Sequence, residues 1–169
     1  LFPYTTLFRS TLIYTVLCSV LVFCFFNFRK KAKCFAGDVG SVSIAFILLF
    51  LIGKLIIETG DFSWILLLSV YGVDSVLTIV HRLMLHENIG LPHRKHLYQL
   101  MANELKIPHV VVSSVYMVLQ LFIAAGLLWL PIDHWVYFFC VISCLMVIYV
   151  VLVKKYYPLH EAYLKQKKK

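Results

Sequence analysis

Residues 135–153 read WVYFFCVISCLMVIYVVLV and contain no charged side chain over nineteen positions. A helix needs about 20 residues to cross the hydrocarbon core of a membrane, with about 17 as a lower bound. The run has no alternation of polar and apolar residues, so it favours a helix over a strand of a membrane barrel. Four further apolar runs precede it in the chain: Thr11–Phe28, Val42–Ile57, Trp64–Val80 and Val110–Leu130. The sequence therefore predicts an all-α, polytopic membrane protein with about five transmembrane helices, although Val42–Ile57 is slightly short unless its neighbours extend it.

The composition excludes a soluble domain of this size. Hydrophobic residues make up 62% of the 169 residues and charged residues only 14%, with a mean hydropathy of +0.87. A soluble domain could not remove that much apolar surface from water, because most of its residues would still face the solvent. We therefore expect lipid to surround most of the chain.

The basic residues are distributed as in a membrane protein. Sixteen Lys and Arg residues give a net charge of +8, which in isolation could also indicate a nucleic-acid partner. However, fourteen of them fall into three clusters that each follow an apolar run, at residues 29–33, 82–106 and 154–169. Cytoplasmic loops carry such an excess of positive charge. We therefore predict a multi-pass protein of the inner (plasma) membrane with a cytoplasmic C-terminus, and no nucleic-acid partner.

The other connections fit the outer face of the membrane. Residues 58–63 and 131–134 contain acidic residues and no Lys or Arg. Three tryptophans fall beside these connections, where aromatic belts are expected: Trp64, Trp129 and Trp135. A long loop over residues 82–109, between the third and fourth helices, and a basic tail over residues 154–169 then lie on the cytoplasmic side. The tail is suited to anionic lipid.

The start of the chain differs in kind from the rest. Leu1–Ser10 reads LFPYTTLFRS and resembles a translated sequencing-adapter read. We therefore assign residues 1–10 as a non-native artefact, residues 11–153 as the transmembrane region and residues 154–169 as the tail. On this interpretation the chain is the C-terminal portion of a longer membrane protein.

One carboxylate lies between glycines at the beginning of the second apolar run. Residues 33–43 read KCFAGDVGSVS and place Asp38 between Gly37 and Gly40, followed by Ser41. Asp and Ser are favoured helix N-caps, so a cap is one interpretation. Glycine also lets the backbone approach a ligand, and a helix N-terminus attracts anions. A carboxylate there would suit Mg²⁺, which takes one or two carboxylates together with phosphate oxygens. The spacing alone leaves both interpretations open.

A second carboxylate, Asp74, lies deep within the third apolar run. Carboxylates are costly in membrane helices and are usually paired or functional. His81 and Arg82 follow on nearly the same helical face but are two turns away, so we expect the partner of Asp74 on a neighbouring helix. A structural hydrogen bond between helices and a functional role both remain open.

The long loop over residues 82–109 and the residue before it concentrate histidines and basic side chains. These are His81, His86, His93, His96 and His109, with Arg82, Arg94, Lys95 and Lys106. The loop exceeds ordinary connection lengths, which suggests a function. Zinc binding would need three or four well-placed ligands, whereas Arg beside His suits phosphate, because Arg offers a bidentate fork and His can donate or shuttle a proton. An ordinary cytoplasmic loop would explain the charges but not the histidines. Leu97–Leu105 is predicted to form a short amphipathic helix at the interface.

Taken together, these motifs resemble the polyprenyl-phosphate N-acetylhexosamine-1-phosphate transferase family. The family includes enzymes similar to UDP-GlcNAc:undecaprenyl-phosphate GlcNAc-1-phosphate transferases and is related to phospho-N-acetylmuramoyl-pentapeptide transferases. Its Phe-Met-Gly-Asp-x-Gly-Ser motif resembles residues 35–41, with Ala36 in place of Met. Its later pattern of a helical Asp, a basic pair, a Gly and Arg-x-His-Leu/Ile-His is matched in order by Asp74, His81-Arg82, Gly90 and Arg94-Lys95-His96-Leu97. The basic pair begins with His81, and Tyr98 stands where many members have a further His.

The resemblance implies a reaction and a partial site. Such enzymes move a sugar-1-phosphate from a UDP-N-acetylhexosamine to polyprenyl phosphate, release UMP and initiate a lipid-linked cell-envelope glycan. Phosphoryl transfer depends mostly on positioning and on neutralisation of charge by metal and cationic groups. The implied roles are Mg²⁺ binding (Mn²⁺ as a substitute) by Asp38, catalysis by Asp38, Arg94 and His96, and substrate binding by His93, Arg94, His96, Gly37, Gly40, Ser41, Asp74 and Arg82. The implied partners are the two substrates and the membrane, and a homodimer is compatible with the resemblance.

The chain lacks two motifs of that family. An Asp-Asp pair and an Asn-x-x-x-Asp motif, which the family carries on earlier helices, occur nowhere in this sequence. The chain is therefore expected to hold only part of the site and to be inactive alone. The alternative function is non-enzymatic, a transporter segment or scaffold in which Asp74 and the histidines line an ion path.

Overall fold

The computed structural model of the chain describes residues 3–29, 33–34, 36–90 and 95–167. The structure is 83% helical, and the described residues contain no strand. Its elements in chain order are α1 (Pro3–Asn27), α2 (Gly37–Thr59), the 3₁₀ helix η1 (Phe62–Leu68), α3 (Ser69–Met84), α4 (Leu97–Asn103), α5 (His109–Trp129) and α6 (His134–Lys167).

Five helical segments within the described residues are long and apolar enough to cross a membrane: Ser10–Asn27, Gly37–Thr59, Phe62–Met84, His109–Trp129 and His134–Pro158. This confirms the predicted all-α, polytopic membrane fold. The second segment is longer than its apolar run, because α2 continues the helix at both ends, through the residues before Val42 and the residues after Ile57. The helix thereby reaches 23 residues, which removes the shortfall that the sequence indicated.

The chain divides into two compact units, residues 1–46 and residues 47–169. The first contains α1 and the beginning of α2. Within it, two residues that follow α1 bond back to that helix, since the Cys34 amide donates to Asn27 Oδ1 at 3.0 Å and Arg29 Nε donates to the Phe25 carbonyl at 2.9 Å. The second unit contains the rest of the helices and is described separately below.

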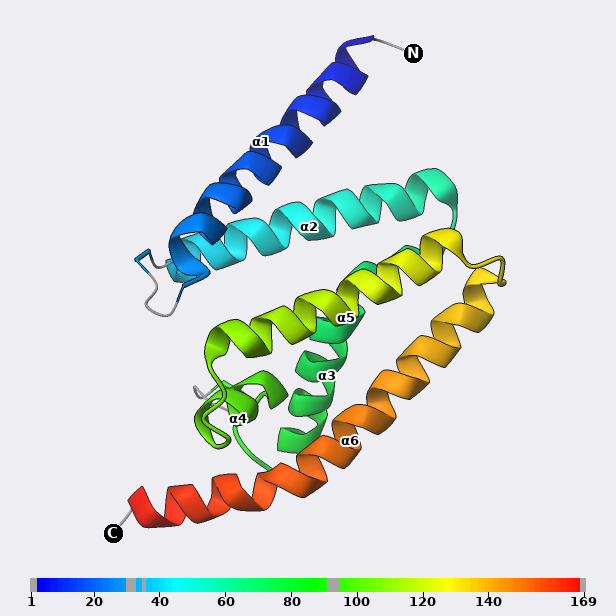
Figure 1. Cartoon of the computed structure of the whole chain (residues 1–169). Coiled ribbons are helices and arrows are strands. Elements are labelled where there is room, and N and C mark those ends of the chain that lie inside the picture. The colour runs from blue at the N-terminus through cyan, green and yellow to red at the C-terminus, as the bar shows by residue number, and fades with distance from the viewer. Residues whose placement is uncertain (1–2, 30–32, 35, 91–94, 168–169) are drawn as a thin grey trace. The chain divides into compact units, whose positions relative to one another are not determined.

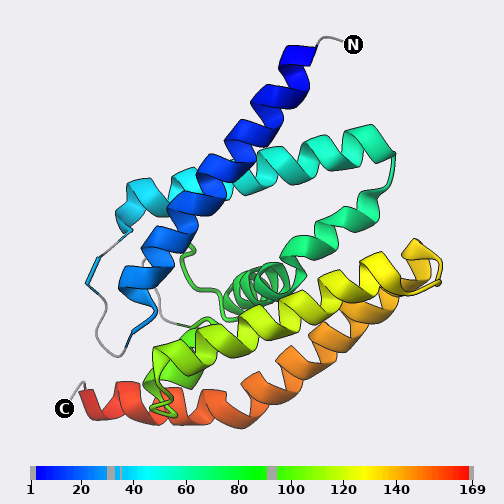
Figure 2. The same cartoon turned by 45° about the horizontal axis from the view of Figure 1, so that its top comes forward.

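In the second unit, α3, α5 and α6 pack around a shared core. Figures 1 and 2 show α5 and α6 side by side, with the short α4 near the end of the unit that is distant from the α5–α6 turn. The buried core consists of Leu66, Val70, Ile123, Leu127 and Leu145, from η1, α3, α5 and α6. A second cluster joins α4 to α6 through Leu97, Tyr149 and Val153.

Many large apolar side chains of these helices point outward. Phe122 on α5 is 72% exposed, and Phe139 on α6 is 62% exposed. In lipid such residues face a solvent as apolar as themselves, so helix association depends on close packing and on hydrogen bonds between helices. The few polar side chains inside the unit therefore carry much of its specificity.

The third membrane segment begins as a 3₁₀ helix and becomes α-helical at Ser69. Gln120 of α5 lies against this change, since its Nε2 donates to the Leu66 carbonyl at 2.8 Å and its Oε1 accepts from the Val70 amide at 3.1 Å. A membrane interior offers no water to irregular backbone, which must be satisfied by neighbouring helices. One amide side chain thus supports the break in the helix.

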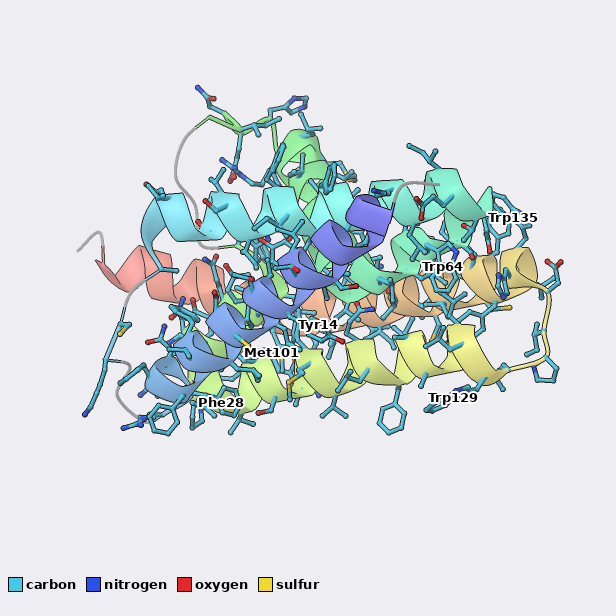
Figure 3. The ribbon with its side chains drawn as sticks, turned by 90° about the horizontal axis from the view of Figure 1, so that it is seen from above. Tyr14, Phe28, Trp64, Met101, Trp129 and Trp135 are labelled. Atoms are coloured by element: carbon cyan, nitrogen blue, oxygen red, sulfur yellow. The ribbon has the colours of Figure 1, made fainter. Side chains whose placement is uncertain are left out.

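One end of the second unit carries aromatic and acidic residues. Figure 3 shows Trp64, Trp129 and Trp135 together at this end, as the sequence predicted for one interface. Asp61 accepts from the Ser63 amide at 2.8 Å and also pairs with His134, and this pairing holds the pKa of Asp61 below its ordinary value. The α2–η1 connection is thereby fixed to the start of α6.

α6 is the longest helix and continues beyond its membrane segment. It runs to Lys167 with Pro158 inside it, so the backbone of the basic tail is helical as far as that residue. Proline removes one helical hydrogen bond and bends a helix, and Figure 1 shows α6 changing direction towards its C-terminal part.

Candidate functional site

Asp74 is a buried carboxylate that bonds to several elements of the second unit. It lies on α3 with only 3% of its surface exposed. Among the described residues, its carboxylate accepts four hydrogen bonds, from Thr78 Oγ1 at 3.2 Å, the Leu97 amide at 2.9 Å, the Tyr98 amide at 3.4 Å and the Tyr116 hydroxyl at 3.0 Å. The prediction that its partner lies on a neighbouring helix is confirmed by Tyr116 of α5.

The two amides belong to the first turn of α4. Helices leave their first amides without internal partners, and a carboxylate is a favourable acceptor there. Asp74 therefore holds the start of α4 against α3, although the two residues stand 23 positions apart in the chain. The Leu97–Leu105 prediction is confirmed as a short helix, which ends at Asn103.

This arrangement places His96 beside the carboxylate. His96 immediately precedes α4, and its Nδ1 lies 3.9 Å from Asp74 Oδ1. Its ring stacks on Tyr98, with centroids 5.6 Å apart and an interplanar angle of 21°. Burial, with smaller effects from Tyr71 and Asp74, raises the pKa of Tyr98, so its hydroxyl stays neutral at physiological pH.

The network continues to α6 through Thr78. Its hydroxyl lies 2.9 Å from the Tyr149 hydroxyl and also bonds to Asp74. One carboxylate thereby connects α3, α4 and α5 directly and α6 through one side chain. Sequence reasoning missed Tyr116 and Tyr149, whose contacts depend on the register of different helices. Thr78 could have been found, because it lies four residues after Asp74 on the same helical face.

Arg82, two turns further along α3, organises the turn that follows the helix. It is 2% exposed. Its Nη2 donates to the Asn88 carbonyl at 2.6 Å, its Nη1 to the Ile89 carbonyl at 3.3 Å and its Nε to Glu87 at 3.3 Å. A buried charge is tolerated only when it is paired in this way. The predicted substrate-binding role of Arg82 remains a prediction, and its evident role is to hold the loop.

Glu87 also pairs with Lys95, which brings the two sides of the loop together. The hydrogen bond from Lys95 outweighs burial and holds the pKa of Glu87 below its ordinary value. Burial lowers the pKa of Lys95, but its bonds to Glu87 and Tyr157 exceed that effect and raise it overall. Lys95 Nζ lies 3.2 Å from the Tyr157 hydroxyl, so the loop is fixed to α6.

The glycine-flanked carboxylate occupies the first turn of α2. Gly37 begins the helix with a φ of 62°, a conformation that favours glycine. Ser41 Oγ donates within the helix to the carbonyls of Gly37 and Asp38, at 3.0 and 3.1 Å. A Cβ at Gly40 would lie 3.2 Å from that of Ala36, so the turn is closely packed.

Asp38 itself is exposed, and its carboxylate makes no hydrogen bond or ion pair within the described part of the chain. An exposed carboxylate fits the contribution of one Asp to an Mg²⁺ site whose remaining ligands are water and phosphate. The described residues contain no group of three or more His, Cys, Asp and Glu side chains that could hold a metal.

The predicted site residues are distributed over both units. Asp38, Gly37, Gly40 and Ser41 belong to the first, whereas Asp74, Arg82 and His96 belong to the second. The structure brings Asp74 and His96 together, while His93 and Arg94 lie outside the described residues. Comparison of the chain with protein-family models, with curated proteins and with solved structures found no match.

Proposed function

We propose that the chain is the C-terminal part of a membrane transferase that moves N-acetylhexosamine-1-phosphate from a UDP-sugar to polyprenyl phosphate. The observation that carries the proposal is the bonding of Asp74 to the start of α4, which sets His96 at the loop end of the membrane helices. A buried carboxylate that orders a basic loop supports a site where a charged nucleotide meets a lipid phosphate. The order of the sequence motifs supports the same reaction.

In the proposed reaction, an oxygen of polyprenyl phosphate forms a bond to the β-phosphorus of the UDP-sugar. The bond from that phosphorus to the bridging oxygen breaks, and UMP leaves with the electron pair. Bound Mg²⁺ would neutralise the charge of the diphosphate. Asp38 would contribute a carboxylate to the metal, and Gly37 and Gly40 would let the backbone approach the substrate. His93, Arg94 and His96 would bind phosphate oxygens, and Arg82 would keep the loop in place.

The proposal includes the location and partners of the protein. The reaction takes place at the cytoplasmic face of the inner membrane, because UDP-sugars are cytosolic. The substrates are a UDP-N-acetylhexosamine and polyprenyl phosphate. The alternative, an ion path lined by Asp74, is less favoured because that carboxylate already accepts four hydrogen bonds from the described residues.

The test is Asp38→Asn in the proposed full-length transferase. We expect Mg²⁺-dependent release of UMP to fall by about 10³-fold or more, as for other groups that stabilise transition-state charge. Glu58→Gln, at the opposite end of α2, is the control and should retain activity. Turnover by Asp38→Asn equal to that of the control would remove Asp38 from the metal role, and transfer by the purified 169-residue chain would contradict its expected inactivity.

A further inference from the structure

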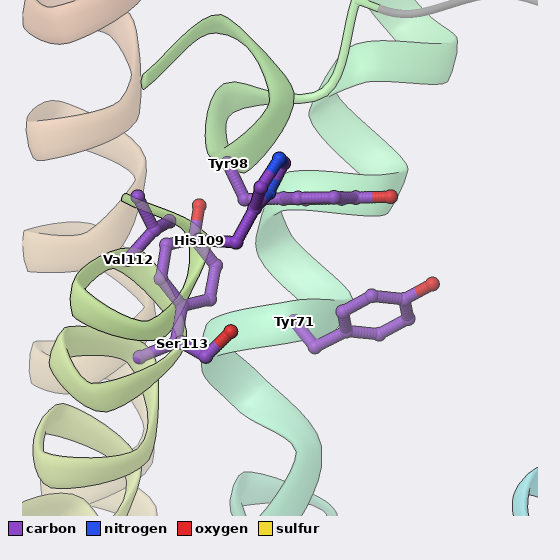
Figure 4. Close-up of a pocket in the computed structure, with 6 residues that line it drawn as sticks. Tyr71, Tyr98, His109, Val112 and Ser113 are labelled. Atoms are coloured by element: carbon purple, nitrogen blue, oxygen red, sulfur yellow. The ribbon is translucent and has the colours of Figure 1, made fainter. Parts of the chain in front are cut away.

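A pocket of about 260 Å³ opens between α3, α4 and α5, beside the Asp74 network. Its lining consists of Tyr71, Tyr98, His109, Val112, Ser113 and Tyr116. Figure 4 shows Tyr98 from α4 lying beside His109 of α5, with Tyr71 of α3 and Ser113 of α5 below them. None of these residues is a predicted site residue, so the pocket has no assigned role.

The chemistry of the lining suits an uncharged ring. Three phenol rings and an imidazole provide flat faces, and the hydroxyl of Ser113 adds a polar group. Among the described residues, neither Lys nor Arg lines the pocket, and these are the side chains that usually bind phosphate. Small-molecule sites combine apolar and aromatic walls with a few polar groups that fix orientation.

The volume limits the size of that ligand. Pockets for drug-sized molecules usually enclose about 300–1,000 Å³. A pocket of about 260 Å³ is smaller than this range, so it suits one ring with its substituents and not a whole nucleotide.

The Asp74 carboxylate holds two walls of the pocket in place. Asp74 accepts from the Tyr98 amide at 3.4 Å and from the Tyr116 hydroxyl at 3.0 Å. The rings of Tyr98 and Tyr116 meet edge to face, with centroids 6.4 Å apart. Binding to a pre-formed pocket requires little further ordering of side chains.

Tyr98 connects the pocket to the proposed phosphate site, because its ring also stacks on His96. A ring bound in the pocket would therefore lie close to a phosphate bound at His96. In a UDP-N-acetylhexosamine the hexose is bonded directly to the β-phosphate, whereas ribose and a second phosphate separate the uracil from it. We propose that this pocket binds the pyranose ring of the N-acetylhexosamine, an assignment that rests on the proposed function.

The test measures binding of a free sugar, independently of turnover. The probes are methyl N-acetyl-α-glucosaminide and uridine, observed by saturation-transfer NMR with the 169-residue chain in lipid nanodiscs. Ser113→Leu adds bulk at an exposed position of the pocket wall, and Val115→Leu adds it on α5 at an exposed position outside the lining. We expect Ser113→Leu to weaken glycoside binding about tenfold or more, while Val115→Leu leaves it unchanged.

Glycoside binding that is absent, or that is insensitive to Ser113→Leu, would overturn the assignment. Loss of uridine binding in that variant would also overturn it. Mg²⁺-dependent binding of UDP, measured in parallel, separates this inference from the proposed function. UDP binding without glycoside binding would reject the sugar pocket alone. Glycoside binding that Ser113→Leu blocks, without UDP binding, would support the pocket. The transferase would then be judged by the Asp38→Asn test, because this chain is expected to hold only part of that site.

Discussion

At the scale of single residues, Asp74 accepts hydrogen bonds from donors on α3, α4 and α5. The membrane interior cannot supply water to these groups, so each bond satisfies a donor that would otherwise remain costly. Arg82 acts similarly towards the carbonyls of the following loop. Two charged side chains thus add polar contacts to a segment whose apolar contact with α6 runs through Leu97.

The first prediction concerns Asp74→Asn. An amide oxygen can still accept hydrogen bonds, but the variant loses the negative charge, and bonds to charged groups contribute about 1.5–3 kcal/mol each. We expect the amides of Leu97 and Tyr98 to lose about 1–3 kcal/mol of protection against hydrogen exchange. Tyr149→Phe, which removes only the outer member of the network, should have a smaller effect. Equal protection in Asp74→Asn and the unaltered chain would show that α4 does not depend on the carboxylate.

A second prediction follows from Glu87, whose pKa lies below its ordinary value in the folded chain. A carboxyl with a lowered pKa stabilises the fold above its unfolded pKa, and this stabilisation is lost as the pH falls through the lowered folded value. We therefore expect the loop around Glu87 and Lys95 to exchange its amides faster below about pH 4, after correction for intrinsic rates. Glu87→Gln should abolish this acid dependence and Glu58→Gln should not. An acid dependence that persists in Glu87→Gln would assign it to another group.

At the scale of elements, the sequence predicted helices wherever an apolar run was long enough, because length and hydropathy are sufficient to identify a membrane helix. α4 was also predictable, from its amphipathic pattern beside the interface. The 3₁₀ start of the third segment was not, since it depends on Gln120, which lies more than fifty residues away in the chain. The Asp74–α4 contact was equally hidden, because a loop of unknown path separates its two partners.

The third prediction tests the break between η1 and α3. Gln120→Leu would leave the Leu66 carbonyl and the Val70 amide without their side-chain partner, and each buried unsatisfied group costs about 1–3 kcal/mol. We expect SDS-induced unfolding at a lower detergent fraction than for the unaltered chain. Met117→Leu, an exposed change on the same helix, serves as the control. Identical unfolding of both variants would show that the break needs no support from α5.

At the scale of the whole molecule, the charge pattern predicts which ends of the membrane segments face the cytoplasm. The three tryptophans gather at one end of the second unit, as expected for an interface, but the packing of helices does not depend on which side that end faces. Orientation is determined during insertion by flanking charges. It is therefore a property that the sequence predicts and the fold does not test.

The fourth prediction addresses this orientation. Cys34 is exposed and lies in the basic segment before α2, whereas Ile132 is exposed in the α5–α6 turn. In a chain whose other cysteines are replaced by alanine, a membrane-impermeant maleimide should label Cys34 only after the cytoplasmic side is opened. In an otherwise cysteine-free chain, Ile132→Cys should react in intact cells. The reverse pattern would invert the predicted topology.

The bonding of Asp74 also constrains how the protein is made. Its partners on α4 and α5 are synthesised after α3 and become available only as the chain lengthens. A ribosome-bound chain that has not yet produced Tyr116 must carry this carboxylate into the bilayer with fewer donors than the finished fold provides. Insertion of the third helix is thus the step of biogenesis that depends on helices synthesised after it.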